Sequence, residues 1–106
     1  MLKTTQITSS ISIIHGSVNC GFIRDGSCAI LIDCCDTINR SKLAELGIDE
    51  VEMILFTQYR RPNTCGAYHF LSGNTSFLVP DGERKYFEQN KQYWNAWENR
   101  WHVYTH

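Results

Sequence analysis

The feature that most constrains this chain is a hairpin that is apolar on both of its sides. Two apolar stretches, 18–24 and 27–34, flank Asp25-Gly26, a dipeptide that supplies the positive φ angles of a type I′ turn. A two-residue loop at that dipeptide pairs Arg24 with Ser27 and Phe22 with Ala29. Alternation along the strands then gives two apolar sets: Phe22, Ala29 and Leu31 on one face, and Ile23, Cys28, Ile30 and Ile32 on the other. Each face must be covered by a second sheet, by helices or by another chain.

The segments around the hairpin predict an α/β arrangement. Residues 5–14 alternate polar and apolar side chains and predict one or two strands that end near His15-Gly16. A helix is expected over 37–46, with Gly47 as its stop, followed by a strand over 51–57. A second helix over 65–71 and a strand over 75–79 repeat this order. A strand–helix–strand crossover makes its two strands parallel neighbours in one sheet.

Length and charge limit the organisation of the chain and its partners. The 106 residues suit one domain, 1–106, with one hydrophobic core. The net charge is −1, and the chain lacks the excess of positive charge typical of proteins that bind nucleic acids or anionic membranes. Neither partner is therefore expected. Without an apolar run of about 20 residues or a signal-peptide core, the expected location is the cytoplasm. The five cysteines are an odd number without a C-x-x-C pair, which favours reduced thiols.

An aromatic stripe follows Pro80-Asp81-Gly82, where Asp81 is a candidate cap for a third helix. The stripe recurs at helical steps and consists of Phe87, Trp94, Trp97 and Trp101. Packing of this face on the core or on a neighbouring chain is the favoured interpretation. A nucleic-acid stacking platform is disfavoured because basic residues do not flank the stripe.

The order of three segments resembles the start of the metallo-β-lactamase superfamily. These are Asn19-Cys20-Gly21-Phe22-Ile23 in the hairpin, the closing Leu31-Ile32-Asp33, and the strand Ile54-Leu55-Phe56-Thr57 after a helix. The resemblance covers about Ile11 to Val79. It implies the N-terminal half of an αββα sandwich, an α/β (α+β) fold with a mixed sheet and helices on one side.

In that family the strand that corresponds to Ile54–Thr57 ends in T-H-x-H-x-D-H-x-G-G, where three His and one Asp bind two metal ions. The matching stretch here runs from Thr57 to Gly66. Gln58 and Arg60 stand at the first two His positions, Pro62 at the Asp, Asn63 at the third His, and Cys65-Gly66 at the glycines. Arginine stays protonated, proline has no donor atom, and neutral amides are poor zinc ligands. We therefore expect no cofactor at this loop, with zinc as the alternative.

Three further residues are candidates for support or substitute ligation. Asp33 matches a family Asp that supports the metal loop, and without a metal it is expected to hydrogen-bond the loop. Cys65 and His69 stand four residues apart on an expected helix, a spacing that puts a thiol and an imidazole on one face. No catalytic residue is assigned, because the spacing alone supplies neither an orienting group nor an oxyanion hole.

The remaining thiols and imidazoles carry no assigned chemistry. Cys34 and Cys35 are adjacent and are expected to be buried, unreactive thiols. His15, His102 and His106 have no partner at ligand spacing.

The sequence thus favours a non-catalytic half-domain that acts as an interaction or structural module. Its uncovered sheet face would be covered by a second copy, giving a homo-oligomer, or by another polypeptide. The alternative from the enzyme class is a metal-dependent hydrolase fragment whose other half supplies ligands and substrate site. A redox-sensing thiol protein is a third interpretation.

Overall fold

Among the residues that the structure describes, seven strands form one mixed sheet whose order across the sheet follows the order along the chain. This computed structural model describes residues 2–58, 61–71, 73–84 and 101–104. The strands are β1 (Lys3–Gln6), β2 (Ile11–His15), β3 (Cys20–Asp25), β4 (Cys28–Ile32), β5 (Glu50–Leu55), β6 (Ser76–Pro80) and β7 (Trp101–Tyr104). Strands β1 to β4 pair antiparallel, and β4 to β7 pair parallel. The parallel pairing of β4 with β5 and of β5 with β6 confirms the two predicted crossovers.

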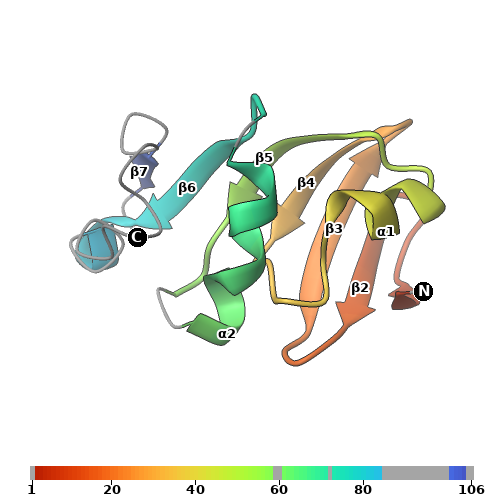
Figure 1. Cartoon of the computed structure of the whole chain (residues 1–106), viewed down its shortest axis with the longest axis horizontal. Helices are drawn as coiled ribbons and strands as arrows, with labels where there is room; N and C mark the ends of the chain where they lie inside the picture. Colours follow the sequence, from red (N-terminus) through yellow and green to blue (C-terminus); the bar gives the residue numbers. More distant parts are fainter. Residues whose placement is uncertain (1, 59–60, 72, 85–100, 105–106) are drawn as a thin grey trace.

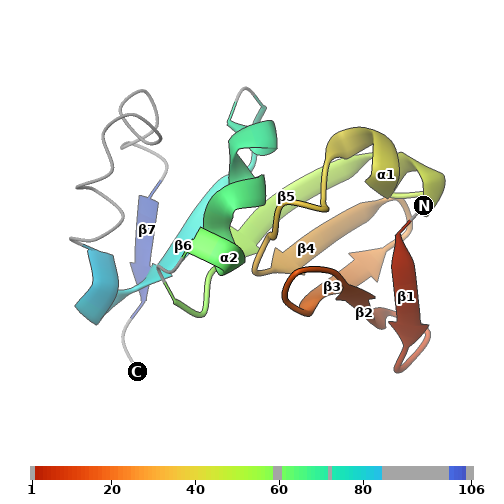
Figure 2. The ribbon, with the colours of Figure 1, turned by 60° about the horizontal axis from the view of Figure 1, so that its bottom comes forward.

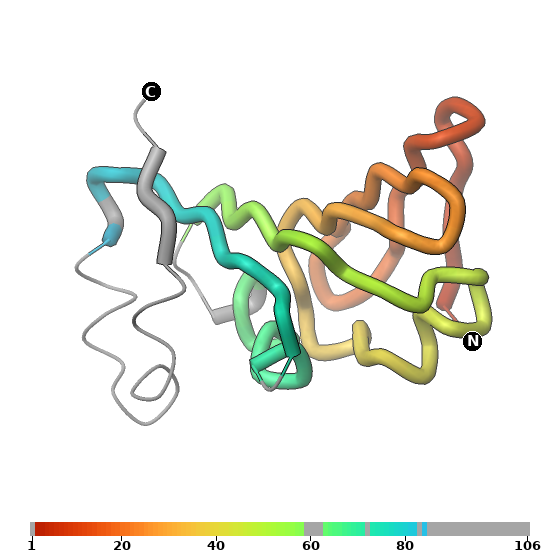
Figure 3. The backbone as a smooth tube through the Cα atoms, turned by 90° about the horizontal axis from the view of Figure 1, so that it is seen from above, coloured from red at the N-terminus to blue at the C-terminus, as the bar shows by residue number. Residues whose placement is uncertain are grey.

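Three helical elements lie on one side of this sheet (Figures 1 and 3): α1 (Arg40–Glu45), α2 (Arg61–Thr64) and the 3₁₀ helix η1 (Cys65–Phe70). A second 3₁₀ helix, η2 (Asp81–Glu83), follows the end of β6. Figure 2 shows α1 and the α2–η1 pair above the central strands, with β1 turned away at the N-terminal edge. The fold is a mixed sheet with helices on one side, as the sequence predicted. No helix among the described residues is long and apolar enough to cross a membrane.

The covered face of the sheet holds the core. A row of directly paired side chains crosses four strands: Phe22, Leu31, Ile54 and Phe77. All four are buried, in one cluster with Leu43 of α1 and Phe70 of η1. Burying each large apolar side chain contributes about 1.5–3 kcal/mol, so this row and its helical cover stabilise the sheet.

The opposite face of the sheet is also apolar, and no described helix covers it. The strand register places two rows of side chains on this face. One row holds Ile11, Ile23, Ile30 and Met53, and the other holds Ile13, Ile32, Leu55 and Leu78. Ile11 and Ile23 are 39% and 40% exposed, whereas the other six side chains are partly buried. The predicted division of the hairpin into two apolar faces is therefore correct.

The predicted register of the hairpin is wrong by two residues. Asp25 pairs with Cys28 and Arg24 pairs with Ala29, so the loop is Gly26-Ser27 and not Asp25-Gly26. Gly26 has φ 63°, which glycine adopts without a steric penalty. Because side chains alternate with a period of two, a shift of two residues leaves every side chain on its predicted face.

Three helical predictions also need correction. Helix α1 begins at Arg40 and not at residue 37, because the Asn39 side chain caps it by accepting a hydrogen bond from the Lys42 backbone N–H (2.9 Å). The predicted helix over 65–71 is the 3₁₀ helix η1 and not an α helix, and the short α helix α2 precedes it. Trp101 begins strand β7 and is not helical. Phe87, Trp94 and Trp97 lie outside the described residues, as does His106.

Candidate functional site

Asp33 anchors the loop that follows β5. It comes directly after β4 and has φ 62°, a left-handed conformation that Asp tolerates better than most residues. Its Oδ1 accepts a hydrogen bond from the Thr57 backbone N–H (2.8 Å), and its Oδ2 accepts one from the Thr57 hydroxyl (2.7 Å). Oδ2 also accepts a hydrogen bond from Asn63 Nδ2 (3.0 Å). Asp33 therefore hydrogen-bonds the loop, the role that the sequence favoured for it.

Asn63 closes the other side of this network. Its Oδ1 accepts a hydrogen bond from Gln58 Nε2 (3.2 Å), and its backbone carbonyl accepts one from the Cys34 N–H (2.8 Å). Only 8% of Asn63 is exposed, and its amide is bonded at both the oxygen and the nitrogen. Gln58 and Asn63, which stand at two His positions of the resembled pattern, thus bind each other, and Asn63 also binds Asp33.

Gly66 sets how closely η1 approaches the segment after β4. Its backbone N–H donates to the Cys34 carbonyl (2.9 Å), and a Cβ at this position would overlap the Cys35 carbonyl oxygen. A glycine is therefore needed for this contact. Gly66 stands at a glycine position of the pattern that this stretch resembles.

At the matched ligand positions that the structure describes, the side chains do not fit a zinc ion. Both Asp33 oxygens accept hydrogen bonds, and Gln58 and Asn63 offer neutral amides that bind each other. Pro62 lies in α2 and has no donor atom, and Arg60 lies outside the described residues. Across the described ranges, no three His, Cys, Asp or Glu side chains gather closely enough to hold a metal ion.

Cys65 and His69 do not form the pair that their spacing suggested. They lie in η1, a 3₁₀ helix with about three residues per turn, so residues four apart point about 120° from each other. The His69 ring is exposed and contacts Tyr68, with ring centroids 4.8 Å apart. Asp33 binds the Thr57 loop instead. The structure therefore does not bring the three substitute ligands together.

Three other cysteines, Cys20, Cys35 and Cys65, lie near Cys34, a grouping that the spacing of these residues did not predict. Burial raises the pKa of Cys34 well above its usual value, and the neighbouring Cys20, Cys35 and Cys65 add to this rise. All five cysteines are free thiols, and Cys20, Cys34 and Cys35 are buried. Cys20 and Cys34 are 14 residues apart in the sequence. They come close because β3 and β4 pair antiparallel, which brings residue 20 beside the end of β4.

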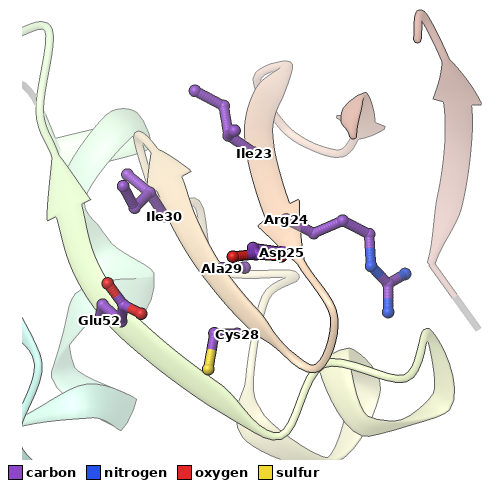
Figure 4. Close-up of a pocket in the computed structure, with 7 residues that line it drawn as sticks. All are labelled: Ile23, Arg24, Asp25, Cys28, Ala29, Ile30 and Glu52. Carbon is purple, nitrogen blue, oxygen red and sulfur yellow. The ribbon is translucent and has the colours of Figure 1, made fainter. Parts of the chain in front are cut away.

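A hollow of about 230 Å³ lies at the opposite end of β4 (Figure 4). Apolar side chains of Ile23 and Ile30 line it together with Asp25 and Glu52. Cys28 at its edge donates a hydrogen bond to Glu50 (3.6 Å). Burial and the adjacent Glu50 carboxylate raise the pKa of the Cys28 thiol, so this thiol is a poor nucleophile.

Comparison with known proteins shows which solved structures have a similar fold. No protein-family model matches the sequence, and no curated protein sequence matches it. Among solved structures, the mono-zinc form of the metallo-β-lactamase FIM-1 from Pseudomonas aeruginosa is similar, with a TM-score of 0.64 and 14% identity. The match covers 84% of this chain and 46% of that one. The chain spans about half the length of the metallo-β-lactamases it matches.

Two other solved structures give the same result. A B3 metallo-β-lactamase with an active-site glutamic acid has a TM-score of 0.65 at 16% identity, over 80% of this chain and 35% of that one. AbOPH, a hydrolase in the β-lactamase superfamily, has a TM-score of 0.66 at 14% identity, over 98% of this chain and 60% of that one. The chain therefore has the fold of half a metallo-β-lactamase.

Proposed function

We propose that this chain is a non-catalytic metallo-β-lactamase-like half-domain that acts as an interaction or structural module. The observation that carries this proposal is the series of hydrogen bonds that runs from Thr57 to Asp33, from Asp33 to Asn63 and from Asn63 to Gln58. A metal loop needs lone pairs directed at the ion, whereas these polar atoms are directed at each other. We assign no catalytic residue and no cofactor.

We further propose that the partner is a second copy of the chain, packed on the uncovered sheet face. Eight apolar side chains line that face, and two of them are about 40% exposed. Two such faces related by a two-fold axis would form one sandwich and remove both from water. The alternative is that another polypeptide packs on the same face. The net charge of −1 favours neither nucleic acid nor an anionic membrane.

The cytoplasm remains the proposed location, because five free cysteines suit a reducing compartment. The competing function is a zinc-dependent hydrolase whose other half supplies ligands and substrate site. It requires the Thr57–Gly66 loop to contribute at least one ligand. The amide pair of Gln58 and Asn63 counts against it.

Metal content separates these two functions. The purified full chain would be incubated with excess zinc, desalted, and measured by elemental analysis. We expect less than about a tenth of a zinc ion per chain, because structural and catalytic sites hold their metal near full occupancy. About one zinc per chain, lost in Asp33→Asn, would refute the non-catalytic assignment and support the hydrolase.

A further inference from the structure

The N-terminal edge of the sheet holds a hydroxyl, an imidazole and an amide in one series of hydrogen bonds. Thr5 lies in β1, His15 ends β2, and Asn19 immediately precedes β3. The Thr5 hydroxyl oxygen lies 2.7 Å from His15 Nε2, and His15 Nδ1 lies 3.2 Å from Asn19 Oδ1. Both ring nitrogens of His15 are therefore engaged, one by a hydroxyl group and the other by an amide oxygen.

The register of β1 against β2 explains why the first two side chains meet. Thr5 pairs with Ile13, so His15, two residues further along β2, lies diagonally across from Thr5 on the same face. Lys3 pairs directly with His15 and shares that face. The edge hairpin thus places a hydroxyl, an imidazole and a positive charge on one surface.

Asn19 determines which nitrogen of the neutral His15 ring carries the proton. An amide oxygen only accepts hydrogen bonds, so Nδ1 is the donor to Asn19. Nε2 then has an available lone pair, and it accepts the hydrogen bond from the Thr5 hydroxyl. The ring is therefore held in the tautomer and the orientation in which Nε2 can take the hydroxyl proton. A nucleophile, its base and an orienting group stand in this order in sites where a hydroxyl is activated.

The three side chains are open to small molecules. Among the described strands β1 pairs only with β2, and Figure 2 shows it at the N-terminal edge of the sheet. Thr5, His15 and Asn19 are all exposed, so a small ester reaches the Thr5 hydroxyl without any movement of the chain. Lys3 adds a positive charge on the same face, which favours the negative charge that develops on an attacked carbonyl oxygen.

We propose that Thr5 is a nucleophilic hydroxyl that takes an acyl group from an activated carboxylic ester, with His15 as its base and Asn19 as the positioning residue. The Thr5 oxygen attacks the ester carbonyl carbon while His15 Nε2 takes the hydroxyl proton. A new C–O bond forms, the bond to the leaving alcohol breaks, and that alcohol departs with the proton from Nε2. The product is an ester of Thr5, and the step needs no oxidant, metal ion or cofactor.

This proposal does not rest on the proposed function. The step is a single acyl transfer to the chain, and it uses neither the Thr57–Gly66 loop nor a second copy. The failure of either proposal would therefore leave the other standing.

Acetylation by p-nitrophenyl acetate tests the proposal on the full chain. The chain would be incubated with a small excess of the ester at neutral pH, digested with trypsin, and analysed by tandem mass spectrometry. Cleavage after Lys3 and Arg24 leaves Thr4 and Thr5 in one peptide, so the two hydroxyls are compared directly. Thr4 lies on the opposite face of β1 and is the internal reference. We expect an acetyl ester on Thr5 and none on Thr4.

Variants of the same residues assign the roles, each checked for its fold by circular dichroism. Thr5→Val abolishes the label, and Thr4→Val leaves it unchanged. His15→Gln slows the acetylation of Thr5 about a hundredfold, as the loss of a positioned general base does. Asn19→Leu slows it about tenfold, because the ring loses its orienting acceptor, whereas Asn19→Asp restores the rate because a carboxylate accepts the same hydrogen bond.

Two results would overturn the proposal. The first is equal labelling of Thr4 and Thr5 in the unaltered chain, or labelling confined to its amino groups and thiols. The second is an unchanged rate of Thr5 acetylation in a folded His15→Gln variant.

Discussion

Asp33 combines a left-handed backbone with a carboxylate that accepts three hydrogen bonds, and substitution can separate the two properties. Asp33→Asn keeps a residue that tolerates positive φ but replaces one oxygen, and we expect it to lower the free energy of unfolding by about 1–2 kcal/mol. Asp33→Ala also loses the remaining acceptor and the conformational tolerance, for a total of about 3 kcal/mol. Urea denaturation measures both. Equal losses would mean that the carboxylate is not what holds the loop.

Cys34 makes stability depend on alkaline pH. Burial raises its pKa well above 9.0, so above pH 9 the folded chain holds a proton that the unfolded chain releases. Stability therefore falls as the pH rises from about 9. We expect guanidinium denaturation at pH 8 and pH 10.5 to show a smaller fall for Cys34→Ala than for the unaltered chain, since lysines and tyrosines titrate in both. An identical fall in the two proteins would contradict the assignment.

The anchoring role of Asp33 was predicted from the resemblance of Leu31-Ile32-Asp33 to the family pattern, whereas the grouping of Cys20, Cys35 and Cys65 near Cys34 could not be predicted. The hydrogen-bond partners of Asp33 lie 24 and 30 residues further along the chain, so residue spacing alone does not indicate them. The cysteine grouping depends on the register of β3 against β4 and on the path of the chain after β4. The predicted register was wrong by two residues, so no side-chain contact near the ends of the hairpin could be derived.

At the scale of elements, η1 packs against the segment after β4 through Gly66. The Cβ added by Gly66→Ala would overlap the Cys35 carbonyl, which is backbone and cannot swing away. We expect this substitution to lower the free energy of unfolding by about 3 kcal/mol, as overpacking of a tight contact does. Gly82→Ala is the matched control, because a Cβ there has no atom within 4 Å, and it should change stability by less than about 0.5 kcal/mol. Equal urea midpoints for the two variants would refute the role of Gly66.

The kinds and faces of the elements followed from the sequence more reliably than their detailed geometry. Alternation placed the hairpin side chains on the correct faces, and the crossovers gave the correct parallel neighbours. The 3₁₀ geometry of η1 was not predictable, because residue spacing is compatible with either kind of helix. That error alone created the supposed pair of Cys65 and His69.

At the scale of the whole molecule, the uncovered apolar sheet face is the reason to expect a partner. Ile23→Lys places a charge at the middle of that face, where packing against a second copy would bury it without a partner charge. We expect this variant to sediment as a monomer. Ala44→Lys, at an exposed position of α1 behind the covered face, is the matched control and should leave the association unchanged. If the two variants had the same oligomeric state, the contact between copies would lie elsewhere.

Sedimentation equilibrium of the unaltered full chain at micromolar concentration tests the central claim most directly, because the claim requires a second copy on the apolar face. The account predicts a mass of about twice the 12.3 kDa of one chain. A stable mass of 12.3 kDa across that concentration range would contradict it.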